Sequence, residues 1–256
     1  MIPYFEWTSV QIGPLTLYVW GFFVAMGFIL GAYVAGLFAK KRGQNPKIIH
    51  DLVVYLMGGG IVGGRLGYIL FYSPQTFIQD PISMLYVWDG GLSIFGGFVV
   101  STLAGIWYLK KKQVDVWSYA DSAIFGLPLG LFIGRIGCFL IHDHPGTATH
   151  FVLGVQYPDG VVRHDHGLYL SINGLVLALL FLWISRKPRP VGTYIAVFLA
   201  WYGVVRFTLD FYRSVDVRYG GLTPAQYFSI CLVIFGGWLL YSLKNNPNNF
   251  YYGRDK

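Results

Sequence analysis

Long apolar runs, each about the length of a membrane-crossing helix, alternate with short polar connections along the chain. A bilayer core is spanned by roughly 20 apolar residues in a helix. The runs predict helices at residues 15–39, 51–72, 92–109, 118–141, 167–185, 191–213 and 224–243. The pattern therefore predicts an all-α integral membrane protein. We expect a single seven-helix domain over residues 1–256, with residues 142–166 as a small head outside the helices.

Composition and charge agree with this prediction. Hydrophobic residues make up 55% of the chain and charged residues 12%, which is about half the charged share of an average soluble domain. The net charge is +7, but the basic residues form short clusters between apolar runs. Such clusters are typical of membrane topology, so no nucleic-acid partner is expected. Cys138 and Cys231 both lie inside apolar runs, which argues against a disulfide framework.

The distribution of lysine and arginine also predicts the orientation of the helices. Most of the 19 basic residues fall in the connections 40–47, 110–112 and 186–189 and in the tail after 243. These four segments all lie on one side of the predicted bundle. The positive-inside rule then places the N-terminus outside and the C-terminus in the cytoplasm, and residues 142–166 lie outside.

Three arginines, Arg65, Arg135 and Arg206, fall within the predicted spans. A charge inside a span is costly and marks a functional site by default. Asp210 lies one turn after Arg206 and is predicted to pair with it. The only other acid well inside a span is Asp121, so at least one arginine needs an anion from outside the protein. The guanidinium fork matches phosphate oxygens, and the abundant phosphate of a membrane belongs to lipid head groups.

Glycines recur every fourth residue in two of the predicted helices. These glycines are Gly59, Gly63 and Gly67 in one helix and Gly126, Gly130 and Gly134 in the other. Stripes of small residues let membrane helices approach closely, so we expect tight helix packing there. The segment "WDGGLSIFGG" (88–97) enters the third helix through paired glycines, where the backbone can come close to a ligand.

Five of the six histidines fall between residues 142 and 166, in two His-Asp-His triplets at 142–144 and 164–166 and at residue 150. Three interpretations of this cluster stay open. The histidines can act as bases in proton transfer, they can hold zinc, or they can belong to a solvated loop. The metal signal is weak, because His-x-His in a loop lacks the further spacing of a zinc motif.

Seven motifs occur in order along the chain: "IGPLTLYVWG" (12–21), "GGRLGYILFY" (63–72), "VWDGGLSIFGG" (87–97), "GRIGCF" (134–139), "RHDHGLY" (163–169), "YGVVRFTLDFYR" (202–213) and "LTPAQ" (222–226). With them the chain resembles the prolipoprotein diacylglyceryl transferases, seven-helix enzymes of the bacterial inner membrane. The resemblance implies transfer of a diacylglyceryl group from phosphatidylglycerol to the lipobox cysteine of a prolipoprotein signal peptide, with release of glycerol phosphate. This is the first step of lipoprotein maturation. Membrane lipids are further expected partners, and no cofactor is expected.

The resemblance also implies roles for individual residues. Arg135 is expected to bind the lipid phosphate, and Arg206 with Asp210 to complete the site. Asp143 stands where the family has a glutamate. The predicted substrate-binding residues are Arg65, Gly96, Gly97, Arg135, Gly146 and Arg206, the predicted catalytic residues are His142, Asp143, His144 and Asp210, and no metal ligand is assigned.

Three positions depart from the family pattern. Phe95 replaces the histidine of an "HGG" motif, Cys138 replaces an asparagine, and Trp20 replaces a tyrosine. The reaction must remove the proton of a thiol whose pKa is about 8.5, and histidine is the usual base. Because phenylalanine cannot act as a base, we expect His142 or His144 to supply it, with Asp143 or Asp165 orienting the ring.

Other functions stay open on the same fold. The departures at Phe95 and Cys138 favour a divergent transferase that uses phosphatidylglycerol with another acceptor. A non-catalytic lipid-binding relative is a further alternative, although the three arginines within the spans argue against it because buried charge without use is costly. No inverted repeat of broken helices is visible, which disfavours a transporter.

Overall fold

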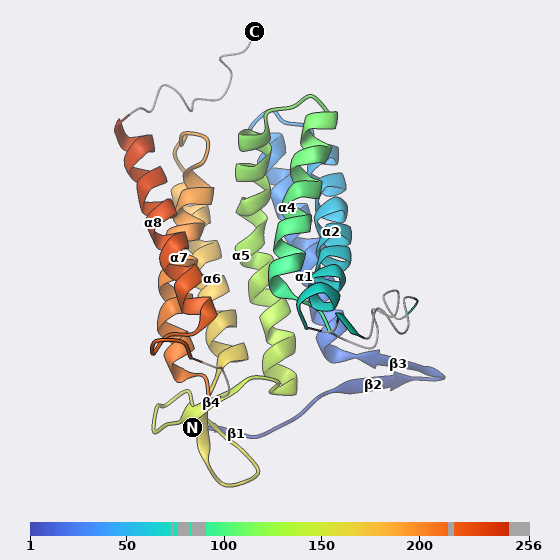
Figure 1. Cartoon of the computed structure of the whole chain (residues 1–256), viewed down its shortest axis with the longest axis vertical. Helices are drawn as coiled ribbons and strands as arrows, with labels where there is room; N and C mark the ends of the chain where they lie inside the picture. The colour runs from blue at the N-terminus through green and yellow to red at the C-terminus, as the bar shows by residue number, and fades with distance from the viewer. Residues whose placement is uncertain (73, 76–81, 83–90, 215–217, 246–256) are drawn as a thin grey trace. The chain divides into compact units, whose positions relative to one another are not determined.

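The computed structural model describes residues 1–72, 74, 75, 82, 91–214 and 218–245 (Figure 1). Its long helices are α1 (Val19–Lys41), α2 (Pro46–Tyr72), α4 (Ile94–Lys111), α5 (Val116–Ile141), α6 (His166–Ile184), α7 (Thr193–Leu209) and α8 (Pro224–Asn245). A short 3-10 helix, η3 (Asp210–Tyr212), continues α7. Within the described residues, all of the long helices except α4 are long and apolar enough to cross a membrane. The chain is therefore a mainly helical integral membrane protein, and the seventh span stays a prediction.

The first predicted helix begins later than its apolar run. Residues 15–18 belong to a hairpin in which β2 (Ser9–Ile12) pairs antiparallel with β3 (Leu15–Tyr18). A Gly-Pro turn joins the strands, with a φ of 61° at Gly13, a conformation that suits tight hairpin turns. The prediction of a helix from residue 15 was wrong because an apolar strand and an apolar helix segment look alike over a few residues.

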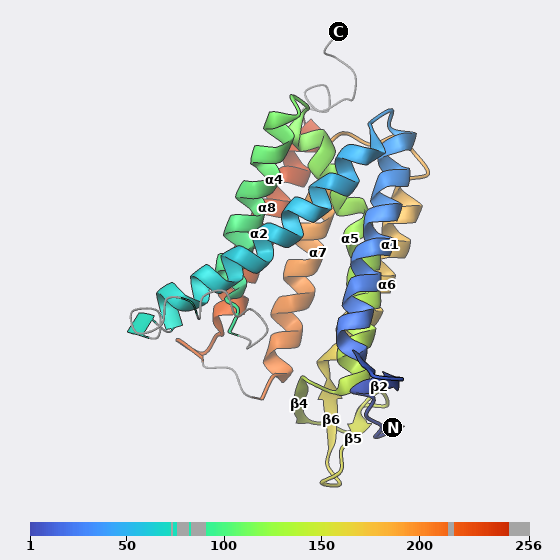
Figure 2. The same cartoon turned by 90° about the vertical axis from the view of Figure 1, so that its right-hand side faces the viewer.

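The segment 142–166, predicted as a small head outside the helices, contains a small sheet. Its strands are β4 (Pro145–Ala148), β5 (Val155–Gln156) and β6 (Val162–Asp165), and β1 (Ile2–Pro3) joins them in the order β1-β5-β6-β4. Figure 2 shows β4, β5 and β6 gathered at one end of α5, α6 and α7. The all-α prediction left the structure of this segment open, and the structure adds the sheet. Strands this short leave almost no alternating pattern in the sequence.

The chain divides into two compact units, of which one is Ala39–Tyr119. In this unit α2 packs on α4 through the predicted glycine stripe. A side chain at Gly63 would overlap the carbonyl oxygen of Gly96, and a side chain at Gly67 would lie 2.9 Å from the Cα of Gly96. The prediction of close packing along Gly59, Gly63 and Gly67 is confirmed.

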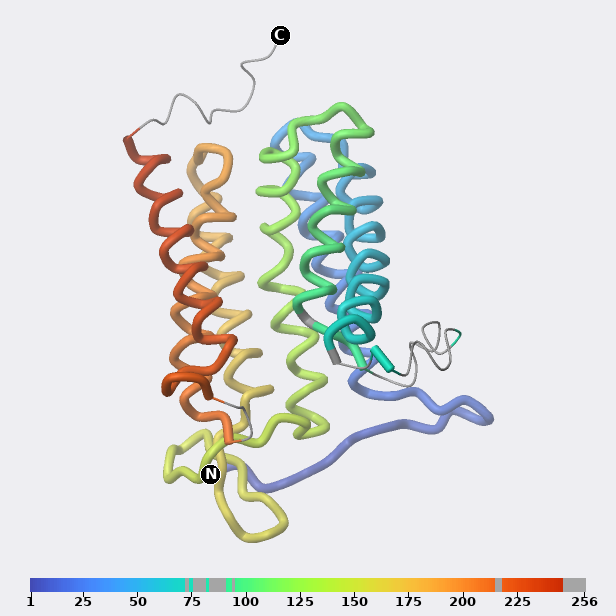
Figure 3. The backbone as a smooth tube through the Cα atoms, in the orientation of Figure 1, coloured from blue at the N-terminus to red at the C-terminus, as the bar shows by residue number. Residues whose placement is uncertain are grey.

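The other unit contains Met1–Phe38 and Ala120–Lys256. Here α1 meets α5 where Gly27 and Gly31 face Gly130 and Gly126. Its core is an aromatic and aliphatic cluster made by Phe38, Phe125, Leu177, Phe181, Tyr194 and Phe198. Figure 3 traces α7 and α8, which run side by side and pack on each other in this unit.

Asp121, one of the two acids predicted inside the spans, caps a helix. Its side chain is fully buried, and its Oδ1 accepts hydrogen bonds from the backbone N–H of Tyr194 at 2.8 Å and of Ile195 at 3.0 Å. A carboxylate at a helix N-terminus satisfies free N–H groups and interacts favourably with the helix dipole. Asp121, on α5, thereby fixes the start of α7.

Candidate functional site

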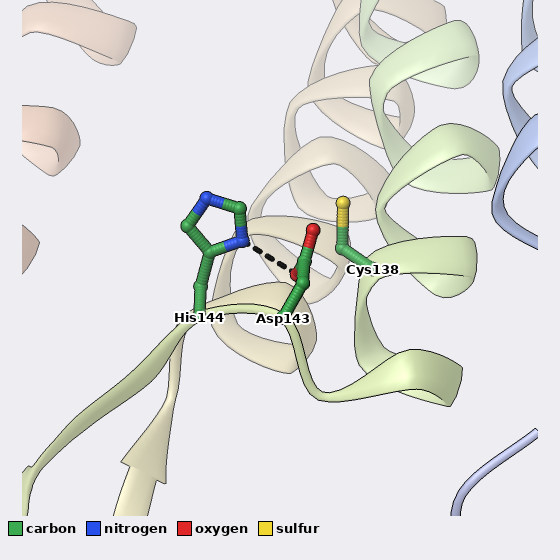
Figure 4. Close-up of side chains that lie close together, drawn as sticks. All are labelled: Cys138, Asp143 and His144. Carbon is green, nitrogen blue, oxygen red and sulfur yellow. Dashed lines mark ion pairs between the residues drawn. The ribbon is translucent and has the colours of Figure 1, made fainter. Parts of the chain in front are cut away.

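The C-terminal end of α5 and the turn after it carry a group of four polar side chains: Arg135, Cys138, Asp143 and His144. A guanidinium nitrogen of Arg135, Nη1, lies 3.8 Å from Sγ of Cys138, one turn further along the helix. The helix ends at Ile141, and His142 turns the chain with a φ of 49°. After this turn the carboxylate of Asp143 points toward Cys138 (Figure 4).

Asp143 also pairs with the next residue. Its Oδ1 lies 2.5 Å from Nδ1 of His144, and about a third of each side chain is exposed. One ligand atom from each of Cys138, Asp143 and His144 can be chosen so that all three lie within 4.8 Å of one another. Figure 4 shows the three side chains turned into one space beside the last turns of α5. The arrangement puts a thiol, a carboxylate and an imidazole next to an arginine.

His142, by contrast, is part of a buried pair. Its Nδ1 lies 2.7 Å from Oδ2 of Asp165, and both side chains are 1% exposed. The hydroxyl of Tyr157 donates to the same carboxylate oxygen at 3.2 Å. The other oxygen of Asp165 accepts from the N–H of Leu168 at 2.9 Å and so caps α6. Asp165 therefore holds the first His-Asp-His triplet against the second.

Aromatic rings enclose the His142 side chain. Tyr4 stacks on it at 4.9 Å between ring centroids, and Phe5, Phe139 and Tyr157 contact it edge to face at 5.1 to 5.7 Å. Nε2 of His142 is buried and has no hydrogen-bond partner among the described residues. Burial, together with the nearby Asp165 carboxylate, raises the pKa of the Tyr157 hydroxyl. The ring of His142 is thus fixed in place and shielded from water.

Two further polar contacts join residues that lie close together in the chain. Nδ1 of His164 lies 2.8 Å from the hydroxyl of Tyr169, and burial lowers the pKa of His164. Arg163 pairs with Asp159 at 2.6 Å on the exposed surface. The hydrogen bond from Arg163 lowers the pKa of Asp159 to about 2. Neither of these two contacts includes His142 or Asp165.

The predicted pair between Arg206 and Asp210 is present. Nη2 of Arg206 lies 3.0 Å from Oδ1 of Asp210, whose side chain is fully buried. The hydroxyl of Thr223 donates to the other oxygen of the carboxylate. The structure corrects the predicted helix at 191–213, since α7 ends at Leu209 and η3 follows it.

Thr223 also begins the next helix through a reciprocal cap. The N–H of Gln226 donates to the Thr223 hydroxyl at 3.1 Å, and the N–H of Thr223 donates to Oε1 of Gln226 at 3.0 Å. This is a capping box, with Pro224 at the first helical position. Sequence reasoning missed it, although the motif "LTPAQ" contains the Thr-x-x-Gln signature. The cap ties the start of α8 to the Asp210 carboxylate.

Backbone contacts bring the ends of α5 and α7 together. Gly146, just after α5, forms a β-bridge with Arg213, just after α7. A side chain at Gly146 would lie 2.6 Å from the carbonyl oxygen of Tyr212, so glycine permits this approach. The hydroxyl of Ser214 donates to the carbonyl of Pro145 at 3.3 Å. The two groups of predicted site residues, around Arg135 and around Arg206, therefore belong to one end of this unit.

Arg65, Gly96 and Gly97 lie in the Ala39–Tyr119 unit. Arg65 is 9% exposed, and its Nη1 donates to the carbonyl of Gly91 at 3.4 Å. Gly96 and Gly97 face the backbone of α2, so close packing accounts for both glycines. Phe95 is exposed. The roles of Arg65, Gly96 and Gly97 in substrate binding stay predictions.

Two members of the site had weak or no signals in the sequence. Cys138 was visible only as a departure from a family motif, and its spacing of three residues from Arg135 put both on one helix face. Tyr157 had no signal, because its contact with Asp165 depends on the fold of the sheet. The structure also decides which aspartate orients which histidine: Asp165 pairs with His142, and Asp143 pairs with His144.

Comparison with known proteins extends over almost the whole chain. The family model for prolipoprotein diacylglyceryl transferase matches residues 8–242. The phosphatidylglycerol–prolipoprotein diacylglyceryl transferase of Solidesulfovibrio magneticus is 37% identical over 252 residues, which cover 93% of this chain and 94% of the relative. The proteins of the same name from Bordetella avium and Acinetobacter baumannii are 33% and 32% identical, over 94% and 93% of this chain and 95% and 93% of the relatives. This chain belongs to the prolipoprotein diacylglyceryl transferase family.

Proposed function

We propose that this protein transfers the diacylglyceryl group of phosphatidylglycerol to the lipobox cysteine of a prolipoprotein. The thiol sulfur attacks the diacylglyceryl carbon that is bonded to the phosphate oxygen, and glycerol phosphate leaves. The family membership and the relatives' names support this function. The reaction is the first step of bacterial lipoprotein maturation.

The arrangement of side chains around Arg135 is the structural observation that supports the proposal. Arg135 lies at the end of α5 beside the Asp143–His144 pair, with Cys138 between them in sequence and 3.8 Å from the guanidinium. The transfer needs a cation for the lipid phosphate and a group that takes up the thiol proton. Both stand here within a few residues of the same helix end.

The geometry favours His144 over His142 in thiol activation. Nδ1 of His142 is held by Asp165, and its Nε2 is buried among aromatic rings. His144 is partly exposed and is oriented by Asp143. A group that acts on a substrate proton must come within hydrogen-bond reach of it. We therefore assign His142 and Asp165 to positioning, and thiol activation to the Asp143–His144 pair.

Arg206 and Asp210 complete the proposed site. As glycerol phosphate leaves, negative charge develops on the phosphate oxygen of the breaking bond. A preorganised cation stabilises such charge strongly in a site of low dielectric constant. Asp210 and Thr223 hold Arg206 in place for this role. Gly146 permits the backbone contact that joins this part of the site to the end of α5.

The proposal includes a topology. We place seven helices across the bacterial inner membrane, with α4 as the seventh span. The N-terminus lies outside and the C-terminus in the cytoplasm, as the basic clusters indicate. The head, residues 142–166, then lies on the outer side, and the chain forms a single membrane domain. Arg65, Gly96 and Gly97 are proposed to contact the lipid substrate.

A different acceptor is the alternative that a specific observation favours. Phe95 stands where the family motif has a histidine, and Cys138 where it has an asparagine. Either change can alter which acceptor molecule the site binds. The use of phosphatidylglycerol as the donor would be the same, since its binding depends on the arginines.

The function is tested with the purified full-length protein in phosphatidylglycerol vesicles. A lipobox peptide is added, and the diacylglyceryl thioether is sought by mass spectrometry. Wild-type protein is expected to give the product, and Arg135→Ala to give none. Arg163→Ala, which changes a half-buried arginine paired with Asp159, serves as the matched control and is expected to retain activity. Absence of product from wild type, despite bound phosphatidylglycerol, would contradict the proposed acceptor.

A further inference from the structure

Cys138, Asp143 and His144 form a set of side chains that the proposed transfer leaves partly unexplained. Cys138 is 6% exposed, and its thiol faces Asp143 in Figure 4. Neither phosphate binding nor proton removal by a histidine needs a buried thiol at this point. The sequence alone suggested zinc only at the two His-Asp-His triplets. The structure instead groups Cys138 with two residues of the first triplet, Asp143 and His144.

Thiolate, carboxylate and imidazole are the three ligand types that zinc takes in proteins. Catalytic zinc sites use three protein ligands and leave a fourth position for water or substrate. The candidate ligand atoms lie within 4.8 Å of one another. With Zn–S near 2.3 Å and Zn–N near 2.0 Å, tetrahedral ligand atoms stand about 3.5 Å apart. The three side chains therefore need to close by about 1 Å, and His144 would exchange its contact with Asp143 for the metal ion.

We propose that Cys138, Asp143 and His144 hold a zinc ion whose fourth ligand is the thiol of the acceptor cysteine. This inference rests on the proposed function and refines it: Asp143 and His144 activate the thiol as zinc ligands, and not as a base that takes up its proton. A thiol that coordinates zinc is deprotonated outright. Zinc thereby replaces the histidine base that Phe95 cannot provide, and it accounts for Cys138 at the same time.

The charges of the site fit this assignment. One thiolate and one carboxylate neutralise the two charges of Zn²⁺, and the imidazole is neutral. The acceptor thiolate then carries the negative charge for attack. Arg135, 3.8 Å from Sγ of Cys138, lies beside the metal position. It can hold the lipid phosphate while the neighbouring carbon meets the zinc-bound sulfur.

The step balances without an oxidant or a reductant. The S–H bond of the acceptor breaks as sulfur binds zinc, and the proton passes to water. The sulfur electron pair forms the bond to the diacylglyceryl carbon. The bond between that carbon and the phosphate oxygen breaks, and glycerol phosphate leaves with the electron pair. The thioether product is a weaker zinc ligand than a thiolate, so it can leave the metal.

Cobalt binding provides a direct test, because Co²⁺ fills zinc sites and its bond to a thiolate absorbs light. Metal-free, full-length protein in detergent is titrated with Co²⁺. We expect one ion per chain and a thiolate charge-transfer band. Cys138→Ser should remove the band, and Cys138→Ser, Asp143→Asn and His144→Gln should each weaken binding by more than about 100-fold, since even outer-shell changes cost 10 to 100-fold. Cys231→Ser and His150→Gln, both at exposed positions, are the matched controls.

The acceptor peptide tests the open position. A peptide with a lipobox cysteine should strengthen the cobalt–thiolate band, and the same peptide with serine should leave it unchanged. If a variant does not fold, X-ray absorption of the zinc-loaded wild type decides instead. One sulfur ligand is expected without peptide and two with it.

Several results would overturn the inference. These are the absence of a cobalt–thiolate band, a band that persists in Cys138→Ser, and a band that does not respond to the thiol peptide. Full transfer by chelator-treated, metal-free protein would also overturn it, while the proposed function would stand. Loss of transfer on chelation and its return with Zn²⁺ would support the inference. If no preparation transfers the lipid, the proposed function fails, and the cobalt spectra still decide whether the site exists.

Discussion

The carboxylate of Asp165 holds Nδ1 of His142 at 2.7 Å, although the two residues are 23 positions apart in the chain. Each belongs to one of the two His-Asp-His triplets, so the triplets pair across the small sheet. The same carboxylate caps α6 through Leu168. The contact joins the end of α5 to the start of α6 and sets the place from which Asp143 and His144 extend.

The first prediction concerns this buried pair. Asp165→Ala should lower the free energy of unfolding by at least about 3 kcal/mol, because removing one partner of a buried pair leaves the other unpaired. The change also removes the cap of α6. Thermal unfolding in detergent measures the effect. Asp159→Ala, which breaks an exposed pair with Arg163, should leave the midpoint nearly unchanged, and equal shifts in the two variants would refute the structural role of Asp165.

The second prediction concerns the shape of the Arg135 side chain. Arg135→Lys keeps the charge but loses the fork that binds two phosphate oxygens. We expect kcat for transfer to fall by about 100-fold or more, since loss of a single preorganised donor has an effect of that order. Initial rates with the lipobox peptide provide the measurement. Arg163→Lys is the control, and wild-type rates in both variants would remove Arg135 from the phosphate site.

The third prediction concerns the start of α8. Thr223→Ala should destabilise the protein by about 1 to 2 kcal/mol, because it removes an N-cap and a donor to the buried Asp210. Thr223→Ser keeps the hydroxyl and should restore most of the stability. Thermal unfolding distinguishes the two variants. Thr208→Ala, at an exposed position on α7, controls for loss of a threonine elsewhere, and a serine variant no more stable than the alanine variant would count against the cap.

The fourth prediction concerns pH. Burial lowers the pKa of His164 below its ordinary value of 6.5, so the unfolded chain binds a proton more readily than the folded chain. Stability is therefore full above about pH 6.5 and falls as the pH drops through the lowered pKa of the folded state. His164→Gln should make the unfolding midpoint less sensitive to acid below pH 6.5. His150→Gln, at an exposed position, should keep the wild-type slope, and an identical slope in both variants would show that His164 does not contribute.

The sequence by itself determined the features that depend on near neighbours. Apolar runs of sufficient length predicted the helices, since a lipid environment demands them regardless of partner. The glycine stripes predicted close packing between helices. The pair of Arg206 and Asp210 followed from a spacing of four residues, which places two side chains on one helix face.

Tertiary structure decided the contacts between distant residues. Two aspartates were equally able to orient either histidine, and the turn at His142 with the pairing of β4 and β6 assigned Asp165 to one and Asp143 to the other. The same turn brought Cys138 to Asp143. Hydropathy describes each residue alone, whereas the choice of partner depends on where the chain reverses and what packs around it.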